Sequence, residues 1–164
     1  MSLLKSEEDA LAKGSPAPNF SLPNVVDNST VSLSDFKGKI VVIIFMCNHC
    51  PYVIPKMEEI KDLQEDFKDK DVVIIPINAN DPVNYPDDNP ENMKRIAEEK
   101  GYNYYLFDES QETAKAYGAV CTPDPYVFDK DHKLAFHGRI NDAMAPESEP
   151  TKHDLREVLD NLTN

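Results

Sequence analysis

Residues 40–53, with the sequence IVVIIFMCNHCPYV, decide how the chain is expected to fold. The first six are apolar and mostly β-branched, which is typical of a central strand buried on both faces. Apolar side chains then recur at spacings of three and four over residues 54–67, the pattern of an amphipathic helix. Cys47 and Cys50 therefore lie at the predicted junction of a buried strand and a helix.

Outward from this stretch, the chain alternates strand-like and helix-like segments. Further strands are expected at 72–77 and in hairpins at 24–31 and 126–137, and further helices at 90–100, 110–118 and 151–162. This order predicts an α/β fold, with a central mixed sheet flanked by helices, in one domain over residues 1–164. We expect residues 1–15 to form a lead-in that can be mobile, and residues 80–89 to form a surface loop.

Charge and composition narrow the class of protein. Of 164 residues, 17 are Lys or Arg and 30 are Asp or Glu, so the net charge is −13 at pH 7. That charge repels phosphate backbones and anionic lipid, so we expect neither a nucleic-acid nor a membrane partner. Three cysteines are too few for a disulfide-rich secreted domain, and no secretory signal is visible, which makes a cytoplasmic location the expectation.

The two cysteines at the strand–helix junction suggest redox chemistry. The helix dipole and the free N–H groups of a first turn stabilise a thiolate, lowering a cysteine pKa from about 8.5 to about 3.5–7.5. Such a thiolate attacks a disulfide, and the second cysteine resolves the mixed disulfide. His49, between them, adds a positive charge when protonated. The alternatives are a structural zinc site, which needs about four ligands, and a pair of inert buried thiols.

Proline placement favours Cys50 as the attacking thiol. Pro51 fits the first position of a helix, where its missing N–H is not needed, and this makes Cys50 the N-cap residue. A helix that began after Cys47 would place Pro51 in its fourth position, and an interior proline costs about 3 kcal/mol. We therefore favour Cys50 as nucleophile with Cys47 as its partner, while the reverse assignment stays open.

Three segments together resemble a known family: CNHCPYV at 47–53, DESQETAKAYGAVCTPDPYVFD at 108–129, and SPAPNFSLPNV at 15–25. They are similar to the thioredoxin-like redoxins, and within them to the peroxiredoxin-like branch of the alkyl hydroperoxide reductase/thiol-specific antioxidant (AhpC/TSA) group. The resemblance implies a thioredoxin-like fold with an N-terminal β-hairpin extension. It also implies a cis-proline loop beside the cysteines, at Thr122-Pro123, although Thr-Pro-Asp-Pro is equally a good ordinary turn.

The resemblance also sharpens the candidate site. A gapless match to related reductases places Cys50 at their first cysteine. Asn48, His49 and Pro51 then flank the pair, and Cys121 adjoins Thr122-Pro123, either as a third redox thiol or as a small packed residue.

Departures from the family pattern limit what the resemblance implies. Counting back from either cysteine, the hydroxyl that orients a peroxide in peroxiredoxins is absent. The chain has no Trp, so the thioredoxin motif is absent too. Residues 40–46 also lack the carboxylate that thioredoxins bury in this strand, so any proton acceptor must come from elsewhere.

We therefore expect a thiol–disulfide oxidoreductase that cycles a Cys47/Cys50 dithiol–disulfide pair, without a cofactor or metal. A thiol-dependent peroxidase with antioxidant activity, using the same cysteines, is the alternative, and a catalytically inactive interaction module is a further one. The expected partners are a disulfide-containing protein or a small-molecule thiol or disulfide, with a thioredoxin-type reductant. The protein is expected to be a monomer or a weak homodimer.

Overall fold

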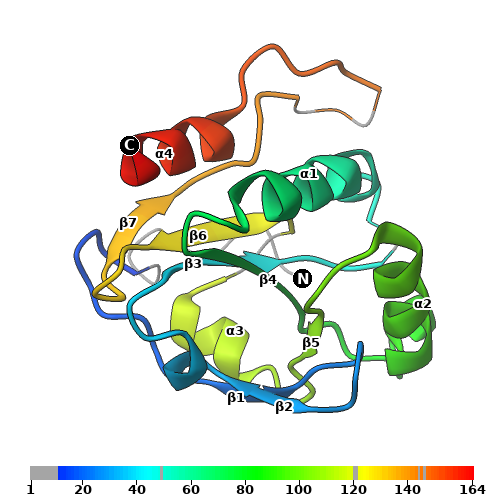
Figure 1. Cartoon of the computed structure of the whole chain (residues 1–164). Helices are drawn as coiled ribbons and strands as arrows, with labels where there is room; N and C mark the ends of the chain where they lie inside the picture. The colour runs from blue at the N-terminus through cyan, green and yellow to red at the C-terminus, as the bar shows by residue number, and fades with distance from the viewer. Residues whose placement is uncertain (1–10, 49, 120–121, 144, 146) are drawn as a thin grey trace.

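A computed structural model describes residues 11–48, 50–119, 122–143, 145 and 147–164 (Figure 1). The strands are β1 (Ser21–Pro23), β2 (Thr30–Ser32), β3 (Ile40–Phe45), β4 (Val72–Asn78), β5 (Leu106–Phe107), β6 (Asp124–Phe128) and β7 (Leu134–His137). The α-helices are α1 (Met57–Phe67), α2 (Pro90–Lys100), α3 (Glu112–Tyr117) and α4 (Asp154–Thr163). Three 3₁₀ helices accompany them: η2 (Leu33–Phe36), η3 (Ile54–Lys56) and η4 (Pro86–Asp88).

The central sheet has five strands in the order β5-β4-β3-β6-β7. Strands β3, β4 and β5 run parallel, whereas β6 is antiparallel to both β3 and β7, so the sheet is mixed, as predicted. The predicted buried strand at 40–45 is β3, in the middle of the sheet, with all six residues buried. The separate β1–β2 hairpin is the expected N-terminal extension, but its first strand is Ser21–Pro23, so the segment 24–31 predicted as the hairpin is mainly the turn between β1 and β2.

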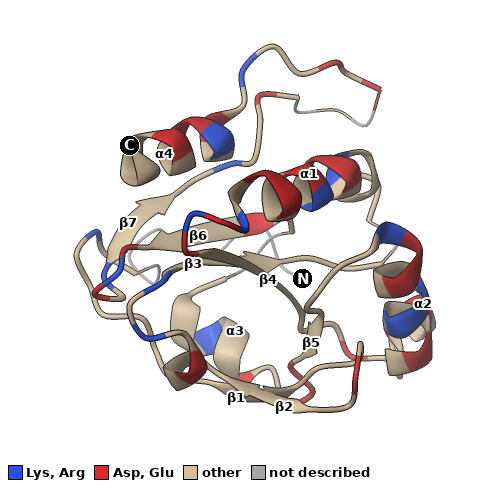
Figure 2. Cartoon of the chain, viewed as in Figure 1, with Lys and Arg blue, Asp and Glu red and all other residues tan. Residues whose placement is uncertain are grey.

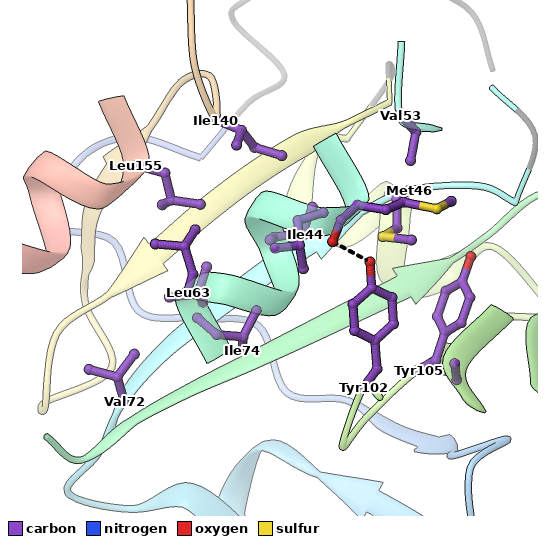
Figure 3. Packing of buried hydrophobic residues seen from close by; sticks show 14 of the residues in the cluster. Ile44, Met46, Val53, Leu63, Val72, Ile74, Tyr102, Tyr105, Ile140 and Leu155 are labelled. Atoms are coloured by element: carbon purple, nitrogen blue, oxygen red, sulfur yellow. Dashed lines mark hydrogen bonds between the residues drawn. The ribbon is translucent and has the colours of Figure 1, made fainter. Parts of the chain in front are cut away.

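Two hydrophobic cores lie on the two faces of the sheet. Alternate residues of β3 point to opposite sides, as side chains in a strand must. Ile40, Val42 and Ile44 pack with α1, α2 and α4, and Figure 3 shows part of this cluster. The intervening residues of β3 pack with α3 and the β1–β2 hairpin on the other face. Burial at this level contributes about 1.5–3 kcal/mol for each large apolar side chain.

The helix that follows β3 begins later than the sequence predicted. Helix α1 starts at Met57, after a turn at residues 51–53 and the 3₁₀ helix η3. Pro55 explains the delay, because it has no N–H to donate and its ring clashes with a preceding carbonyl in a continuous α-helix. The prediction that Pro51 opens the α-helix is therefore wrong.

The later helix boundaries agree better with the sequence. Asn89 caps α2 by accepting a hydrogen bond from the Asn92 N–H (2.8 Å), and Gly101 ends it with a left-handed backbone (φ 74°). Helix α3 is capped by Asp108, whose carboxylate accepts from the Ala114 N–H (2.8 Å). Strand β5 was not predicted, since two residues are too few to show a periodicity.

The described part of the expected lead-in is attached to the sheet. The N–H of Gly14 donates to the carbonyl of Leu134 (2.8 Å), and the N–H of Leu134 donates to the carbonyl of Ser15 (2.8 Å). Residues 11–15 are thus held beside β7. Residues 1–10 lie outside the described residues.

Charged residues lie mainly in the helices and the loops (Figure 2). Strands β3 and β4 carry none. Among the helices that the structure describes, none combines the length and the apolar character that crossing a membrane requires.

Candidate active site

Cys47 and Cys50 meet at Thr122. The Cys47 Sγ lies 3.8 Å from the Thr122 hydroxyl, and the Cys50 Sγ lies 3.9 Å from the Thr122 carbonyl oxygen, to which it can donate. Both cysteines are free thiols. Residues more than 70 positions apart in the sequence are therefore brought together, as the candidate site required.

The sheet register explains why Thr122 lies here. Strand β6 begins at Asp124, which pairs with Phe45 at the end of β3. The residues just before β6 consequently lie beside the residues just after β3. The Thr122–Pro123 peptide bond is cis, as the resemblance implied, so the ordinary-turn alternative is wrong.

The Cys47 thiol is buried, and its surroundings favour the protonated form. Cys47 is 3% exposed, and burial, followed by the negative charges of Cys50 and Asp88, raises its pKa to about 12. Hydrogen bonds from the Thr122 hydroxyl and the Cys50 backbone N–H act in the opposite direction without overcoming this. At neutral pH, Cys47 is therefore a neutral thiol and a poor nucleophile.

Cys50 is placed differently from the prediction. It is partly exposed, and its carbonyl oxygen accepts hydrogen bonds from the N–H groups of Val53 (2.9 Å) and Ile54 (3.0 Å). These amides close a turn onto the Cys50 carbonyl instead of pointing at its sulfur. Cys50 is thus not the N-cap of α1, although it does precede the turn that leads into it.

A buried polar network lies directly behind the cysteines. The Asp88 carboxylate accepts hydrogen bonds from the Asn48 backbone N–H (2.6 Å), from Asn78 Nδ2 (3.0 Å) and from Asn80 Nδ2 (2.9 Å). The Tyr105 hydroxyl donates to Asn48 Oδ1 (2.8 Å). Asp88 and Tyr105 are both fully buried. Asn48, which the sequence placed only as a neighbour of the cysteines, therefore joins them to this network.

The network corrects the prediction for residues 80–89. They were expected to form only a surface loop, but Asp88 and Asn80 are buried beneath it. The Asp87 carbonyl also accepts from Asn48 Nδ2 (2.7 Å), so the loop is anchored to the cysteine segment at two points. The single signal in the sequence was the density of Asn and Asp, which is equally typical of exposed turns.

A buried lysine also borders the site. Lys56 is 8% exposed, and its ammonium donates to the Ala143 carbonyl (2.8 Å). Burial lowers the Lys56 pKa, while the negative charges of Glu59 and Cys50 act to raise it. A helix-start lysine is ordinarily solvated, so sequence reasoning gave no reason to single it out.

A second polar cluster lies at the start of β6 and was also missed. The buried Asp124 carboxylate contacts His137 Nε2 (2.7 Å) and accepts from the Tyr126 hydroxyl (3.0 Å). The His137 ring stacks on Tyr126, with ring centroids 4.1 Å apart. The sequence alone gave no reason to single out His137, because an isolated histidine on a predicted hairpin is ordinarily a surface residue.

The remaining predicted site residues are less informative. Pro51 is exposed in the turn after Cys50. His49 and Cys121 lie outside the described residues, so their suggested roles stay predictions. Within the part of the chain that the structure describes, no three His, Cys, Asp or Glu side chains are grouped so that they could hold a metal ion.

The strand order and the position of the thiols beside a cis Thr-Pro bond define a thioredoxin-like protein. The thioredoxin domain of a thiol-disulfide oxidoreductase from Bacteroides vulgatus has this fold, with a TM-score of 0.74, 22% identity, and coverage of 94% of this chain and 100% of that one. An uncharacterized conserved protein from Geobacillus kaustophilus is more similar, with a TM-score of 0.87 and 46% identity over 93% of this chain and 82% of that one.

Sequence comparison identifies the family. Residues 13–137 match the AhpC/TSA family, and the chain belongs to it. A curated relative, the thiol-disulfide oxidoreductase ResA of Bacillus cereus, is 27% identical over 159 residues, which cover 96% of this chain and 83% of the relative. The resemblance in the sequence is thereby confirmed at the level of fold and family.

Proposed function

We propose that this chain is a thiol–disulfide oxidoreductase that cycles Cys47 and Cys50 between dithiol and disulfide, with Cys50 as the attacking thiol. The observation that carries the proposal is the unequal environment of two thiols that contact the same residue. Cys50 is partly exposed, whereas Cys47 is buried and its pKa is raised to about 12. The names of the ResA relatives support the same chemistry.

The first half of the cycle uses Cys50. Its thiolate attacks one sulfur of a substrate disulfide, a Cys50–substrate bond forms, and the other substrate sulfur leaves as a thiolate. Thr122 lies against the sulfur that attacks, so an incoming disulfide has to pass beside the Thr122 backbone. In the reduced protein the Thr122 carbonyl accepts a hydrogen bond from the Cys50 thiol. This hydrogen bond is lost when the Cys50 sulfur enters a disulfide, because the sulfur then has no proton to donate.

The second half of the cycle uses Cys47. Its sulfur attacks the Cys50 sulfur, the bond to the substrate breaks, and the reduced substrate leaves. The Cys47–Cys50 disulfide is then returned to the dithiol by an external reductant. We propose a disulfide-containing protein or small-molecule disulfide as substrate and a thioredoxin-type dithiol as reductant, with His49 assisting the thiolate and the protein acting in the cytoplasm.

The proposal is tested by reduction of insulin in the presence of dithiothreitol. We expect the wild-type chain to accelerate reduction and Cys50→Ser to be inactive. Equal rates for wild type and Cys50→Ser would overturn the proposal, as would a Cys47/Cys50 pair that a disulfide substrate never oxidises. The latter result is the one expected of an inactive interaction module.

The peroxidase alternative is tested by measuring how fast the chain consumes hydrogen peroxide with dithiothreitol as reductant. This rate distinguishes a peroxidase from a thiol–disulfide oxidoreductase. The Thr122 hydroxyl lies beside the cysteines, and it contacts the Cys47 sulfur (3.8 Å). We therefore expect peroxide to be consumed no faster than by free cysteine. A rate far above that of free cysteine would favour the peroxidase.

A further inference from the structure

The second half of the proposed cycle raises a question about a proton. Cys47 must lose its proton before its sulfur can attack, and Cys47 and Asn48 are only 3% and 6% exposed. Water therefore has little access to the thiol. A group of the protein has to receive the proton, and β3 itself offers no carboxylate.

Three aspartates are buried in the part of the chain that the structure describes, and their positions differ in a way that selects one. Asp108 caps α3 through the Ala114 N–H (2.8 Å), and Asp124 is engaged with His137 (2.7 Å). Asp88 instead accepts the N–H of Asn48, the residue that follows Cys47, at 2.6 Å. Its carboxylate is thus fixed within one residue of the buried thiol.

We propose that Asp88, delivered by η4 from the loop between β4 and α2, accepts the proton of Cys47 during disulfide formation and returns it when the disulfide is reduced. The inference rests on the proposed function. Asn78 and Asn80 hold the carboxylate in place through their Nδ2 groups (3.0 and 2.9 Å), so it is oriented before the reaction begins. Positioning of this kind reduces the reorganisation that proton transfer requires.

The step balances without a further reagent. The Cys47 proton moves to an Asp88 oxygen, and the Cys47 sulfur forms a bond with the Cys50 sulfur. The Cys50–substrate bond breaks, and its electron pair leaves on the substrate sulfur. The two cysteines are oxidised by two electrons and the substrate disulfide is reduced by two. When an external dithiol reduces the Cys47–Cys50 disulfide, the departing Cys47 sulfur takes the proton back from Asp88.

A purely electrostatic role for Asp88 predicts the opposite effect of its removal. The Asp88 charge is one of the causes that raise the Cys47 pKa, so Asp88→Asn lowers that pKa. If the charge were all that mattered, the variant would resolve mixed disulfides faster. If Asp88 accepts the proton, resolution slows even though Cys47 has become more acidic.

Two neighbouring segments carry titratable groups that act on the same site as Asp88. Cys47 faces Asp88 from the segment after β3, and the buried Tyr105 hydroxyl faces it from the segment before β5, joined through Asn48 and Asn78. Asp87 is exposed beside it, and His49 lies outside the described residues.

The test uses a symmetrical aromatic disulfide whose released thiolate absorbs visible light. Attack by Cys50 releases the first thiolate and attack by Cys47 releases the second, so stopped-flow mixing separates the two steps. For Asp88→Asn we expect the first phase to stay within about twofold of wild type and the second to slow by about 100-fold at neutral pH. The second phase of the variant should recover as the pH rises, because hydroxide replaces the lost acceptor.

Glu91→Gln is the matched control, since it converts an exposed carboxylate to an amide at the start of α2. Both of its phases should stay within about twofold of wild type. If the second phase of thiolate release in Asp88→Asn is as fast as in the wild type or faster, the proposal that Asp88 accepts the proton is overturned. Failure of the wild-type chain to release any thiolate would instead overturn the proposed function, so the two failures are distinguishable.

If Asp88→Asn does not fold, the wild-type chain still permits a decision. The carbon-13 signal of the Asp88 carboxyl group is compared in the reduced and the oxidised wild-type protein at neutral pH. The proposal predicts an ionised Asp88 carboxyl in the dithiol form and a protonated one in the disulfide form, because Asp88 holds the Cys47 proton until the disulfide is reduced. An Asp88 carboxyl that is ionised in both forms would overturn it.

Discussion

Cys47 and Cys50 are three residues apart, yet their surroundings belong to different parts of the molecule. Cys47 is 3% exposed and lies against a buried network anchored by Asp88, whereas Cys50 is partly exposed at the start of a short turn. Tyr52 and Ile54, just after Cys50, are 51% and 50% exposed. One thiol therefore lies in the interior, and the other is partly exposed to solvent.

This difference shows how a short motif can assign two roles. The same helix-start pattern, read from the sequence alone, gave only a preference between the cysteines. Burial and the neighbouring charges favour Cys50 as the attacking thiol, because they hold Cys47 protonated and leave Cys50 partly exposed. Four sets of variants can break or sharpen this comparison.

Replacing the cysteines themselves should have the largest effect. Cys50→Ser should lose all disulfide reduction, while Cys47→Ser should still attack and then remain as a stable mixed disulfide, because nothing resolves it. Mass spectrometry after mixing with an aromatic disulfide checks both. A mixed disulfide on Cys47 in Cys50→Ser, formed as fast as the one on Cys50, would remove the distinction between the two thiols.

Tyr105→Phe tests how much the buried polar network behind Cys47 contributes to the stability of the protein. The change removes a buried hydroxyl that donates to Asn48 Oδ1 (2.8 Å), and leaving that oxygen unsatisfied should lower the free energy of unfolding by about 1–3 kcal/mol. Urea unfolding measures the loss. Tyr85→Phe, the same change at a side chain 41% exposed, should stay within about 0.5 kcal/mol, and equal losses in the two variants would contradict the network.

Thr122→Val should have a smaller effect, confined to the resolving step. The Thr122 hydroxyl lowers the Cys47 pKa by hydrogen bonding, so its removal raises that pKa further and disfavours the attacking form. We expect the second thiolate-release phase to slow by about threefold to tenfold, in line with about 1 kcal/mol for a hydrogen bond. Thr122→Ser keeps the hydroxyl and should behave as wild type; a loss as large as that of valine would point to packing instead.

Tyr52→Ala should have the smallest effect on stability. The side chain is 51% exposed beside Cys50, so its loss should change the free energy of unfolding by no more than about 0.5 kcal/mol. Thermal unfolding checks this. A large destabilisation would mean that the Cys50 side is as tightly packed as the Cys47 side.

The sequence predicted the framework well because the framework follows from periodicity and capping. Two local signals predicted their elements correctly. The apolar run at 40–45 forms β3, and α2 begins after its N-cap Asn89 and ends at Gly101. The start of α1 was misplaced because the effect of Pro55 on the preceding turn was underestimated. A two-residue strand such as β5 leaves no local signal at all.

The site was predicted only as far as its local part. Cys47 and Cys50 stood out through their spacing, and Thr122-Pro123 through the resemblance. Asp88 could not be found in this way, because its burial depends on contacts with Asn48, 40 positions earlier. Aspartate among prolines and asparagines is typical of exposed loops, so only the tertiary structure distinguishes this one.

The most direct test of the division between the cysteines is site-resolved alkylation of the reduced protein at neutral pH, read by mass spectrometry. Because burial raises the Cys47 pKa to about 12, Cys47 is a neutral thiol at pH 7. The account predicts that iodoacetamide modifies Cys50 first and leaves Cys47 unmodified until the protein is unfolded. Modification of Cys47 at a rate equal to or above that of Cys50 in the folded protein would contradict it.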